Sequence, residues 1–175
     1  MVQAFTILRK KYLWSAELYL AGAKESDIRD ALRERQIRVE EVDWQKIHLL
    51  GDLGSEKLTD YYNLCDVFCM PSYFEAYGLV FAEALTYGLP CIGRDKFAMS
   101  EFIEDGCTGR LISGEDAEEL ALDLWEVLQD PKYREEVERR REWYLREYSW
   151  DKVAQRICSV MEKNERDKDQ YRSAG

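Results

Sequence analysis

The stretch that decides the fold is residues 71–83, PSYFEAYGLVFAE. It follows the apolar run Asp66–Pro71, which is typical of a buried strand, and it leads into an apolar helix predicted over Leu79–Tyr87. Glycine at position 78 lets backbone N–H groups approach a ligand closely, and the positive end of the helix points at the same spot. A strand, a glycine turn and a helix N-terminus in this order predict a site suited to a diphosphate.

Outward from this stretch, short apolar runs alternate with segments of helical periodicity along the chain. Strands are predicted at 17–22, 46–51, 66–71, 89–93 and 110–113, and helices at 2–13, 26–38, 55–63, 79–87, 99–103, 115–129, 131–147 and 150–165. Near-continuous apolar strands between helices indicate an α/β fold, with a Rossmann-like parallel sheet covered on both faces. Residues 1–148 are expected to form this domain, 149–165 a C-terminal helix and 166–175 a polar tail.

Composition narrows the classes of function. The 175 residues are 46% hydrophobic and carry a net charge of -10, which argues against a nucleic-acid partner. No apolar run reaches the roughly 18 residues that a membrane span needs, so we expect a cytoplasmic protein, peripheral at a membrane only if a longer parent is. Five cysteines and one histidine, with no C-x-x-C pair, indicate reduced thiols and predict no metal site.

Two glutamates are the candidate reactive groups of the stretch. Glu83 is the only charged residue between Ala76 and Gly93, and its helical neighbours include Leu79 and Val80. A carboxylate on such an apolar face needs hydrogen-bond partners, which the backbone, an arginine or ligand hydroxyls such as a ribose diol would supply. Taken alone, Glu75 is an ordinary loop acid, and Glu83 alone is a structural one.

Together, eight positions apart across a glycine turn, these two residues resemble the E-x7-E motif of family-four GT-B glycosyltransferases. The flanking match extends over about residues 2–162. It includes segments similar to the family patterns L-x-I-x-G, V-x-F-x-G, Y-x-x-A-D-V, P-S-x-x-E-x-F-G-L, E-A-M-A-x-G-x-P and D-G-x-T-G, at 18–22, 47–51, 61–67, 71–79, 83–90 and 105–109. The resemblance implies the nucleotide-sugar-binding half of a GT-B enzyme.

The resemblance also implies roles for individual residues. Glu75 would be catalytic, contacting the sugar near the leaving phosphate, and Glu83 would hold the ribose hydroxyls. The remaining donor-binding positions would be the backbone amides of Tyr77, Gly78 and Leu79 and the base-facing turn with Leu50, Gly51 and Leu53. The family transfers a sugar with retention of configuration, usually without a metal or other cofactor, and often in polysaccharide biosynthesis.

The chain departs from the family pattern in three places. The first strand of the family domain, its basic loop and the N-terminal acceptor domain are absent, and His48 is no substitute for that domain's catalytic histidine. Because the absent strand is central, we expect a gap in the sheet and a chain that is a fragment. The family's glycine pair is replaced by Phe97-Ala98, so we expect a weaker phosphate contact there.

The predicted partners are a nucleotide sugar and either the missing N-terminal domain or a second copy bound through the C-terminal helix. This helix carries an apolar stripe of Trp150, Val153, Ile157, Val160 and Met161. The alternative to binding a partner is that the stripe packs in the core of its own domain. A non-catalytic module of the same fold stays open as a second function. The block 71–90 argues against a third, another GT-B enzyme such as an epimerase or phosphorylase, because it matches the transferase pattern closely. The sugar, base and acceptor cannot be read from the sequence.

Overall fold

The computed structural model describes the backbone of residues 1–38 and 41–173, and side chains as far as residue 161. Its five strands are all parallel, as predicted. They are β1 (Leu18–Ala21), β2 (Ile47–Gly51), β3 (Phe68–Cys69), β4 (Cys91–Arg94) and β5 (Gly109–Ile112). Each lies within a predicted apolar run or extends one residue beyond it, so the sequence located the strands correctly.

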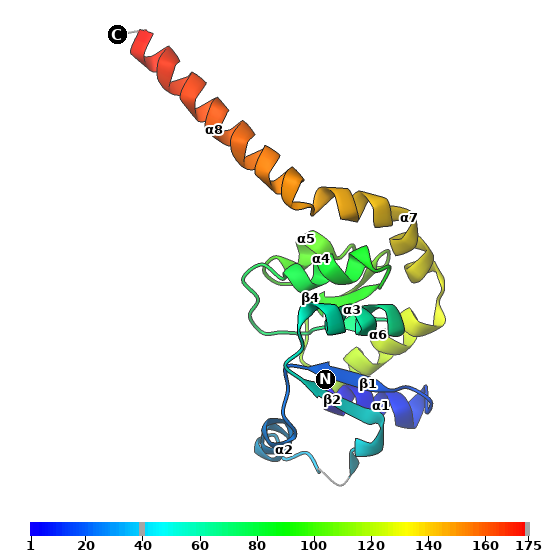
Figure 1. Cartoon of the computed structure of the whole chain (residues 1–175). Helices are drawn as coiled ribbons and strands as arrows, with labels where there is room; N and C mark the ends of the chain where they lie inside the picture. Colours follow the sequence, from blue (N-terminus) through cyan, green and yellow to red (C-terminus); the bar gives the residue numbers. More distant parts are fainter. Residues whose placement is uncertain (39–40, 174–175) are drawn as a thin grey trace.

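The strands form two separate pieces of sheet, β1-β2 and β3-β4-β5 (Figure 1). In the described part of the chain no strand pairs β1 with β3, so the predicted gap in the sheet is present. The strand edges that face the gap make no hydrogen bonds to each other. Backbone hydrogen bonds therefore do not join the two pieces of sheet.

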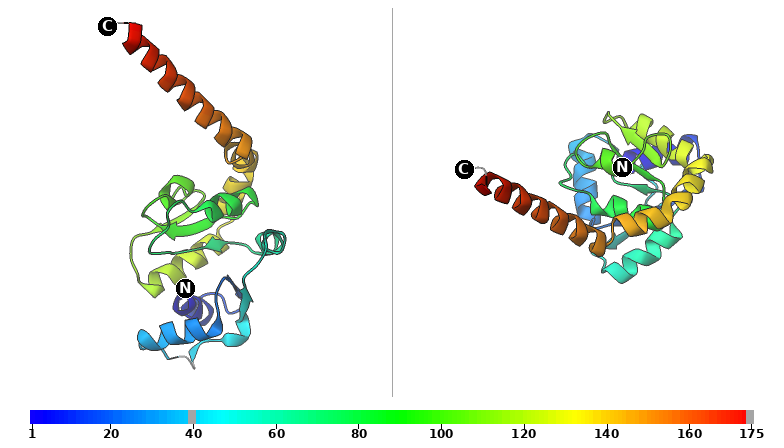
Figure 2. Two further views of the ribbon diagram at one scale, coloured as in Figure 1. Left: turned by 60° about the vertical axis from the view of Figure 1, so that its left-hand side comes forward. Right: turned by 90° about the horizontal axis from the view of Figure 1, so that it is seen from above.

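Helices cover both faces of the strands (Figure 2). They are α1 (Val2–Lys11), α2 (Glu25–Glu34), α3 (Ser55–Leu64), α4 (Leu79–Thr86), α5 (Met99–Phe102), α6 (Ala117–Gln129), α7 (Lys132–Glu147) and α8 (Trp150–Ser173), with a 3-10 turn η2 (Trp44–Lys46) before β2. Alternate residues of one strand enter different cores: Ile92 of β4 packs on the α1 and α6 side, and Cys91 on the α4 and α7 side. This two-sided burial confirms the α/β class.

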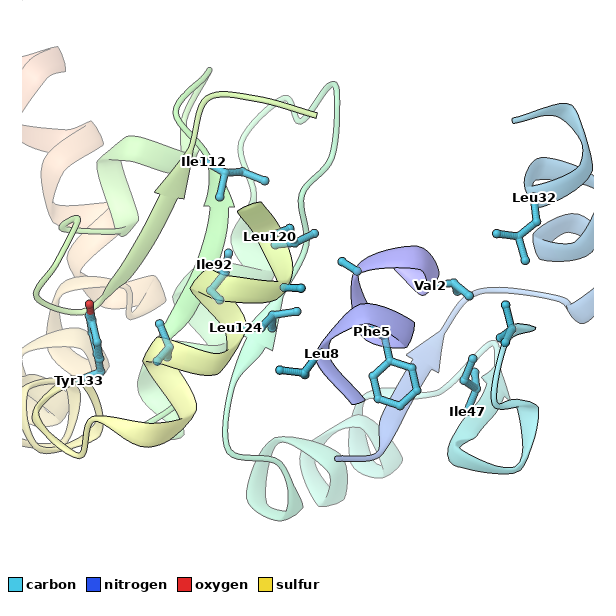
Figure 3. Packing of buried hydrophobic residues seen from close by; sticks show 14 residues of the cluster. Val2, Phe5, Leu8, Leu32, Ile47, Ile92, Ile112, Leu120, Leu124 and Tyr133 are labelled. Atoms are coloured by element: carbon cyan, nitrogen blue, oxygen red, sulfur yellow. The ribbon is translucent and has the colours of Figure 1, made fainter. Parts of the chain in front are cut away.

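The core on the α1 side joins the two pieces of sheet (Figure 3). Leu8 of α1 lies against Leu124 of α6, while Phe5 lies on the opposite side of α1, and the same cluster includes Ile47 of β2 and Ile92 of β4. Phe5 is 3% exposed and Leu8 2%. Because no hydrogen-bonded ladder crosses the gap, the apolar contact between α1 and α6 is the main connection between the two halves of the domain.

Helix α8 extends away from the domain (Figures 1 and 2) and runs past its predicted end at 165. The segment contains no glycine or proline to stop it, which explains the longer helix. Its apolar stripe is exposed, with Trp150 at 83% and Met161 at 59%. The alternative expectation, that this stripe packs in the domain core, is therefore wrong. Among the described helices, none combines the length and apolar character needed to cross a membrane.

We predict that Phe5→Ala destabilises the domain by about 3–5 kcal/mol, because it opens a cavity in the apolar core that joins the two pieces of sheet. Urea unfolding followed by circular dichroism measures the change. Trp14→Ala is the matched control: Trp14 is 79% exposed, so its loss should change the free energy of unfolding by no more than about 0.5 kcal/mol. Equal effects of the two substitutions would contradict the bridging role of α1.

Candidate functional site

The loop between β3 and α4 ends in a glycine that the geometry requires. Gly78, the N-cap of α4, has φ 79°, in the left-handed region. A Cβ at this position would approach the Phe81 ring to 3.1 Å and the Glu75 side chain to 3.2 Å. Both the backbone conformation and the close contacts therefore disfavour a side chain, and the N-terminus of α4 lies at the carboxyl edge of the sheet.

Glu75 lies at this helix N-terminus. Its carboxylate Oε1 accepts a hydrogen bond from the Gly78 backbone N–H at 3.2 Å. A negative charge is stabilised here by the positive end of the helix dipole. The neighbouring side chains of Tyr77 and Leu79 are exposed, and the Tyr77 ring packs edge-on against Phe102 at 5.6 Å. The structure thus brings together Glu75, Tyr77, Gly78 and Leu79 at one helix end.

Glu83 is one helical turn further along α4, on the same exposed side as Leu79. The sequence placed it on an apolar face, but the structure leaves it exposed because the core face of α4 is formed by Phe81, Ala84 and Leu85. Its carboxylate accepts a hydrogen bond from the Tyr62 hydroxyl at 3.2 Å.

Tyr62 of α3 fixes the position of that carboxylate. Its ring stacks on Tyr87 with centroids 5.2 Å apart, and the Tyr87 hydroxyl lies 3.1 Å from Thr59 Oγ1. Burial raises the pKa of Tyr62, and the charge of Glu83 raises it further. Tyr62 therefore stays a neutral donor to Glu83. Sequence reasoning missed it, since nothing local marks which tyrosine of α3 faces α4.

Leu50 and Gly51 are the last residues of β2, in the other piece of sheet, and Leu53 lies in the turn that follows this strand. The Gly51 carbonyl accepts from the Gly22 N–H at 2.8 Å, so the turn is fixed to the end of β1. Helix α3 starts just after this turn and reaches α4 through Tyr62. The turn and Glu83 are thus connected through α3, but the structure places them in different halves of the domain.

His48 lies in β2, as predicted, away from the α4 loop. Its Nε2 is 3.0 Å from the Glu17 carboxylate, and its ring stacks on Tyr19 with centroids 4.5 Å apart. Lys46 pairs with the same carboxylate at 2.8 Å, and hydrogen bonds from Lys46 and His48 lower the pKa of Glu17 to about 2. These contacts tie the start of β1 to β2, which is a structural role.

Arg94, at the end of β4, is a buried cation that sequence reasoning missed. It is 6% exposed, and its guanidinium donates to the Pro71 carbonyl at 3.1 Å and to the Gly114 carbonyl at 2.6 Å. It also lies over the Tyr73 ring, 4.4 Å from the centroid. Within the described residues no carboxylate forms an ion pair with it. Its appearance directly after the apolar run 89–93 was the available signal.

A cavity of about 280 Å³ lies beside Arg94, at the carboxyl ends of β3, β4 and β5. Its walls include Gln3, Arg35 and Tyr73, with Glu115 and Asp116 on the α6 side. Arg94 donates a hydrogen bond to the Pro71 carbonyl, and its guanidinium lies over the Tyr73 ring. These two contacts anchor the first residues of the loop that ends at Gly78.

The segment that replaces the glycine pair adopts a glycine-like backbone. Phe97 has φ 55°, one of two non-glycine residues with positive φ in the described chain. This conformation costs a phenylalanine roughly 1–2 kcal/mol. Its ring meets Phe74 edge to face, with centroids 5.3 Å apart. The turn therefore keeps the shape that glycine would favour, at an energetic cost, despite the substitution.

Comparison with known proteins gives a consistent result. The family model described as "Glycosyl transferases group 1" matches residues 1–144. A D-inositol 3-phosphate glycosyltransferase of Kribbella flavida is 32% identical over 98 residues, which are 56% of this chain and 23% of the relative. An uncharacterized glycosyltransferase of Methanocaldococcus jannaschii is 28% identical over 149 residues, 83% of this chain and 37% of the relative.

Solved structures agree with this match. The pneumococcal O-GlcNAc transferase GtfA, solved in complex with UDP and GlcNAc, has a TM-score of 0.68 at 25% identity and covers 91% of this chain. Sucrose-phosphate synthase from Thermosynechococcus elongatus has a TM-score of 0.72 at 21% identity and covers 95%, which supports the fold. The chain spans 32% and 42% of these two proteins.

We predict that Arg94→Lys lowers the free energy of unfolding by about 1.5–3 kcal/mol, the value of one hydrogen bond to a charged group. A lysine ammonium cannot hold two carbonyls in the fixed geometry of a guanidinium fork and stack on Tyr73 as well. Urea unfolding measures the loss, and Arg33→Lys, at an exposed ion pair on α2, is the control. An unchanged midpoint for Arg94→Lys would show that the two carbonyl contacts add no stability.

A second prediction concerns acid stability. The pKa of Glu17 is about 2 in the folded protein and 4.5 for a free glutamate. A lowered pKa contributes stability that is present above the unfolded value and is lost as pH falls through the folded value. Glu17→Gln should therefore be slightly less stable than the wild type at pH 6, and the two unfolding midpoints should converge as pH falls from 4.5 to 2. A difference that stays constant over this range would contradict the ion-pair origin.

Proposed function

This chain belongs to the glycosyl transferases group 1 family, and we propose that it binds a nucleoside-diphosphate sugar and contributes the donor half of a retaining glycosyl transfer. It spans about a quarter to two fifths of the length of the relatives that it matches. The acceptor site and turnover are assigned in this proposal to an N-terminal GT-B domain.

One observation carries the proposal: two carboxylates and a helix N-terminus lie along α4 at the carboxyl edge of the sheet. Glu75 and Gly78 are at the helix end, and Glu83 is on the exposed side of the same helix. In parallel α/β sheets ligands bind beyond the carboxyl ends of the strands. A diphosphate at the N-terminus of α4 and a ribose diol on Glu83 use both features.

The hydrogen bond of Glu75 suggests how the site responds to the donor. The Glu75 carboxylate accepts a hydrogen bond from the Gly78 amide. A bound diphosphate would compete for the same donor, and repulsion between the two anions would move Glu75 away, toward the sugar. The amides of Tyr77, Gly78 and Leu79 would then stabilise the charge that develops on the departing diphosphate. We propose no metal in this step, so binding should be insensitive to a chelator.

Nucleotide binding by calorimetry tests the proposal. We predict that one of UDP, GDP and ADP binds the intact chain and that Glu83→Ala raises its Kd at least tenfold, because each hydrogen bond to a charged group contributes roughly 1.5–3 kcal/mol. Glu83→Gln should have an intermediate effect, since an amide oxygen still accepts one hydroxyl.

Glu56→Ala is the matched control, an exposed glutamate in the first turn of α3. It should leave the Kd unchanged. If the folded chain binds none of the three nucleotides at millimolar concentration, the donor-site proposal fails, and the non-catalytic module of the same fold becomes the better reading. Selection of one base by Leu50, Gly51 and Leu53 is checked in the same titrations.

A further inference from the structure

Two exposed phenylalanines meet at the carboxyl edge of the three-stranded piece of sheet. Phe74 lies in the loop after β3, and Phe97 in the turn after the neighbouring strand β4. Their rings are edge to face, at 5.3 Å and 70°. Phe74 is 71% exposed and Phe97 52%. Large apolar rings that gather at the surface are typical of an interaction site.

The backbone at Phe97 makes packing an insufficient explanation. A backbone φ of 55° favours glycine, so the conformation alone does not account for a phenylalanine at this position. Burial of the side chain adds little stability, because Phe97 is 52% exposed. Strained residues of this kind cluster at functional sites, where the surrounding structure holds them in place. The side chain of Phe97 therefore has a use at the surface that outweighs its backbone cost.

The surroundings of the pair indicate the kind of occupant. Glu75 directly follows Phe74, and its carboxylate lies at the N-terminus of α4. Tyr77, by contrast, packs on Phe102 on the α5 side and is not part of the pair. An aromatic surface beside a carboxylate matches a sugar ring, which has an apolar C–H face and hydroxyl groups at its edge.

We propose that Phe74 and Phe97 form an aromatic platform for the sugar ring of the donor, an inference that rests on the proposed function. The order along the edge is then diphosphate at the end of α4, Glu75 beside the glycosidic carbon, and the sugar on the exposed face of one ring, which the other ring supports edge to face. The platform selects for the sugar and leaves the affinity for the nucleotide part unchanged.

The test compares each nucleotide with its sugar conjugate. UDP, GDP and ADP, and UDP-glucose, UDP-N-acetylglucosamine, GDP-mannose and ADP-glucose, are titrated by calorimetry into the full chain and Phe97→Gly. Glycine suits φ 55°, so this variant should fold; thermal unfolding checks it. We expect the Kd of the sugar conjugate to rise about tenfold relative to the Kd of its nucleotide, the value of one aromatic stack, whether or not glycine at position 97 improves the phosphate contact. Phe97→Tyr should retain sugar binding.

Gln36→Gly is the matched control, because Gln36 has φ 57° at the end of α2 and its substitution relieves the same backbone conformation without removing an aromatic ring. Saturation-transfer NMR supplies a second readout: Phe97→Gly should lose the signals of the sugar protons and keep those of the base. If both Kd values rise together, if neither changes, or if the wild type binds a nucleotide but none of the conjugates, the platform is overturned while the donor site stands. If no nucleotide binds, the proposed function itself is overturned, and the platform with it.

Discussion

The contact between α1 and α6 is the constraint on which the rest of the structure depends. A parallel sheet normally transmits its geometry through one continuous ladder, but here the ladder stops between β1 and β3. Phe5, Leu8 and Leu124 replace it with apolar packing, which is close-fitting but has no directional hydrogen bonds. The two halves of the candidate site lie on opposite sides of this break. The turn after β2 and the loop before α4 are therefore positioned relative to each other by helix packing and by α3.

Helix α3 has a second consequence for the site. It begins at the turn after β2 and ends near β3, so it spans both pieces of sheet. Its Tyr62 links the Glu83 carboxylate to the stacked ring of Tyr87. A ligand that touches both the turn and Glu83 would stiffen the link between the two halves. Because anything that binds only the folded state adds to its stability, donor binding and the integrity of the split sheet are coupled.

Local periodicity was sufficient to locate the strands and helices, and the family resemblance predicted the break in the sheet and the assembly of Glu75 with Gly78. Sequence reasoning failed where the outcome depends on partners distant in sequence. Arg94 is held by carbonyls that are 23 and 20 residues away. Glu83 faces solvent because Phe81, Ala84 and Leu85 form the core face of α4. Its apolar neighbour Leu79 is itself 55% exposed, which a helical wheel does not reveal. The glycine-like backbone of Phe97 was unexpected for the same reason: the turn is shaped by the elements around it, and the residue conforms.

The charges available at the edge of the sheet limit how strongly this chain can hold a diphosphate. Arg94, the buried cation at this edge, has its guanidinium committed to two carbonyls. A helix N-terminus stabilises an anion by about 0.3–1 kcal/mol, and by up to about 2 kcal/mol when partly buried. Millimolar binding already corresponds to about 4.1 kcal/mol. The helix end therefore cannot account for the affinity alone. The remainder has to come from contacts with the base, the ribose and the sugar, and this makes Glu83 and the aromatic pair more important here than in a site with a full set of cations.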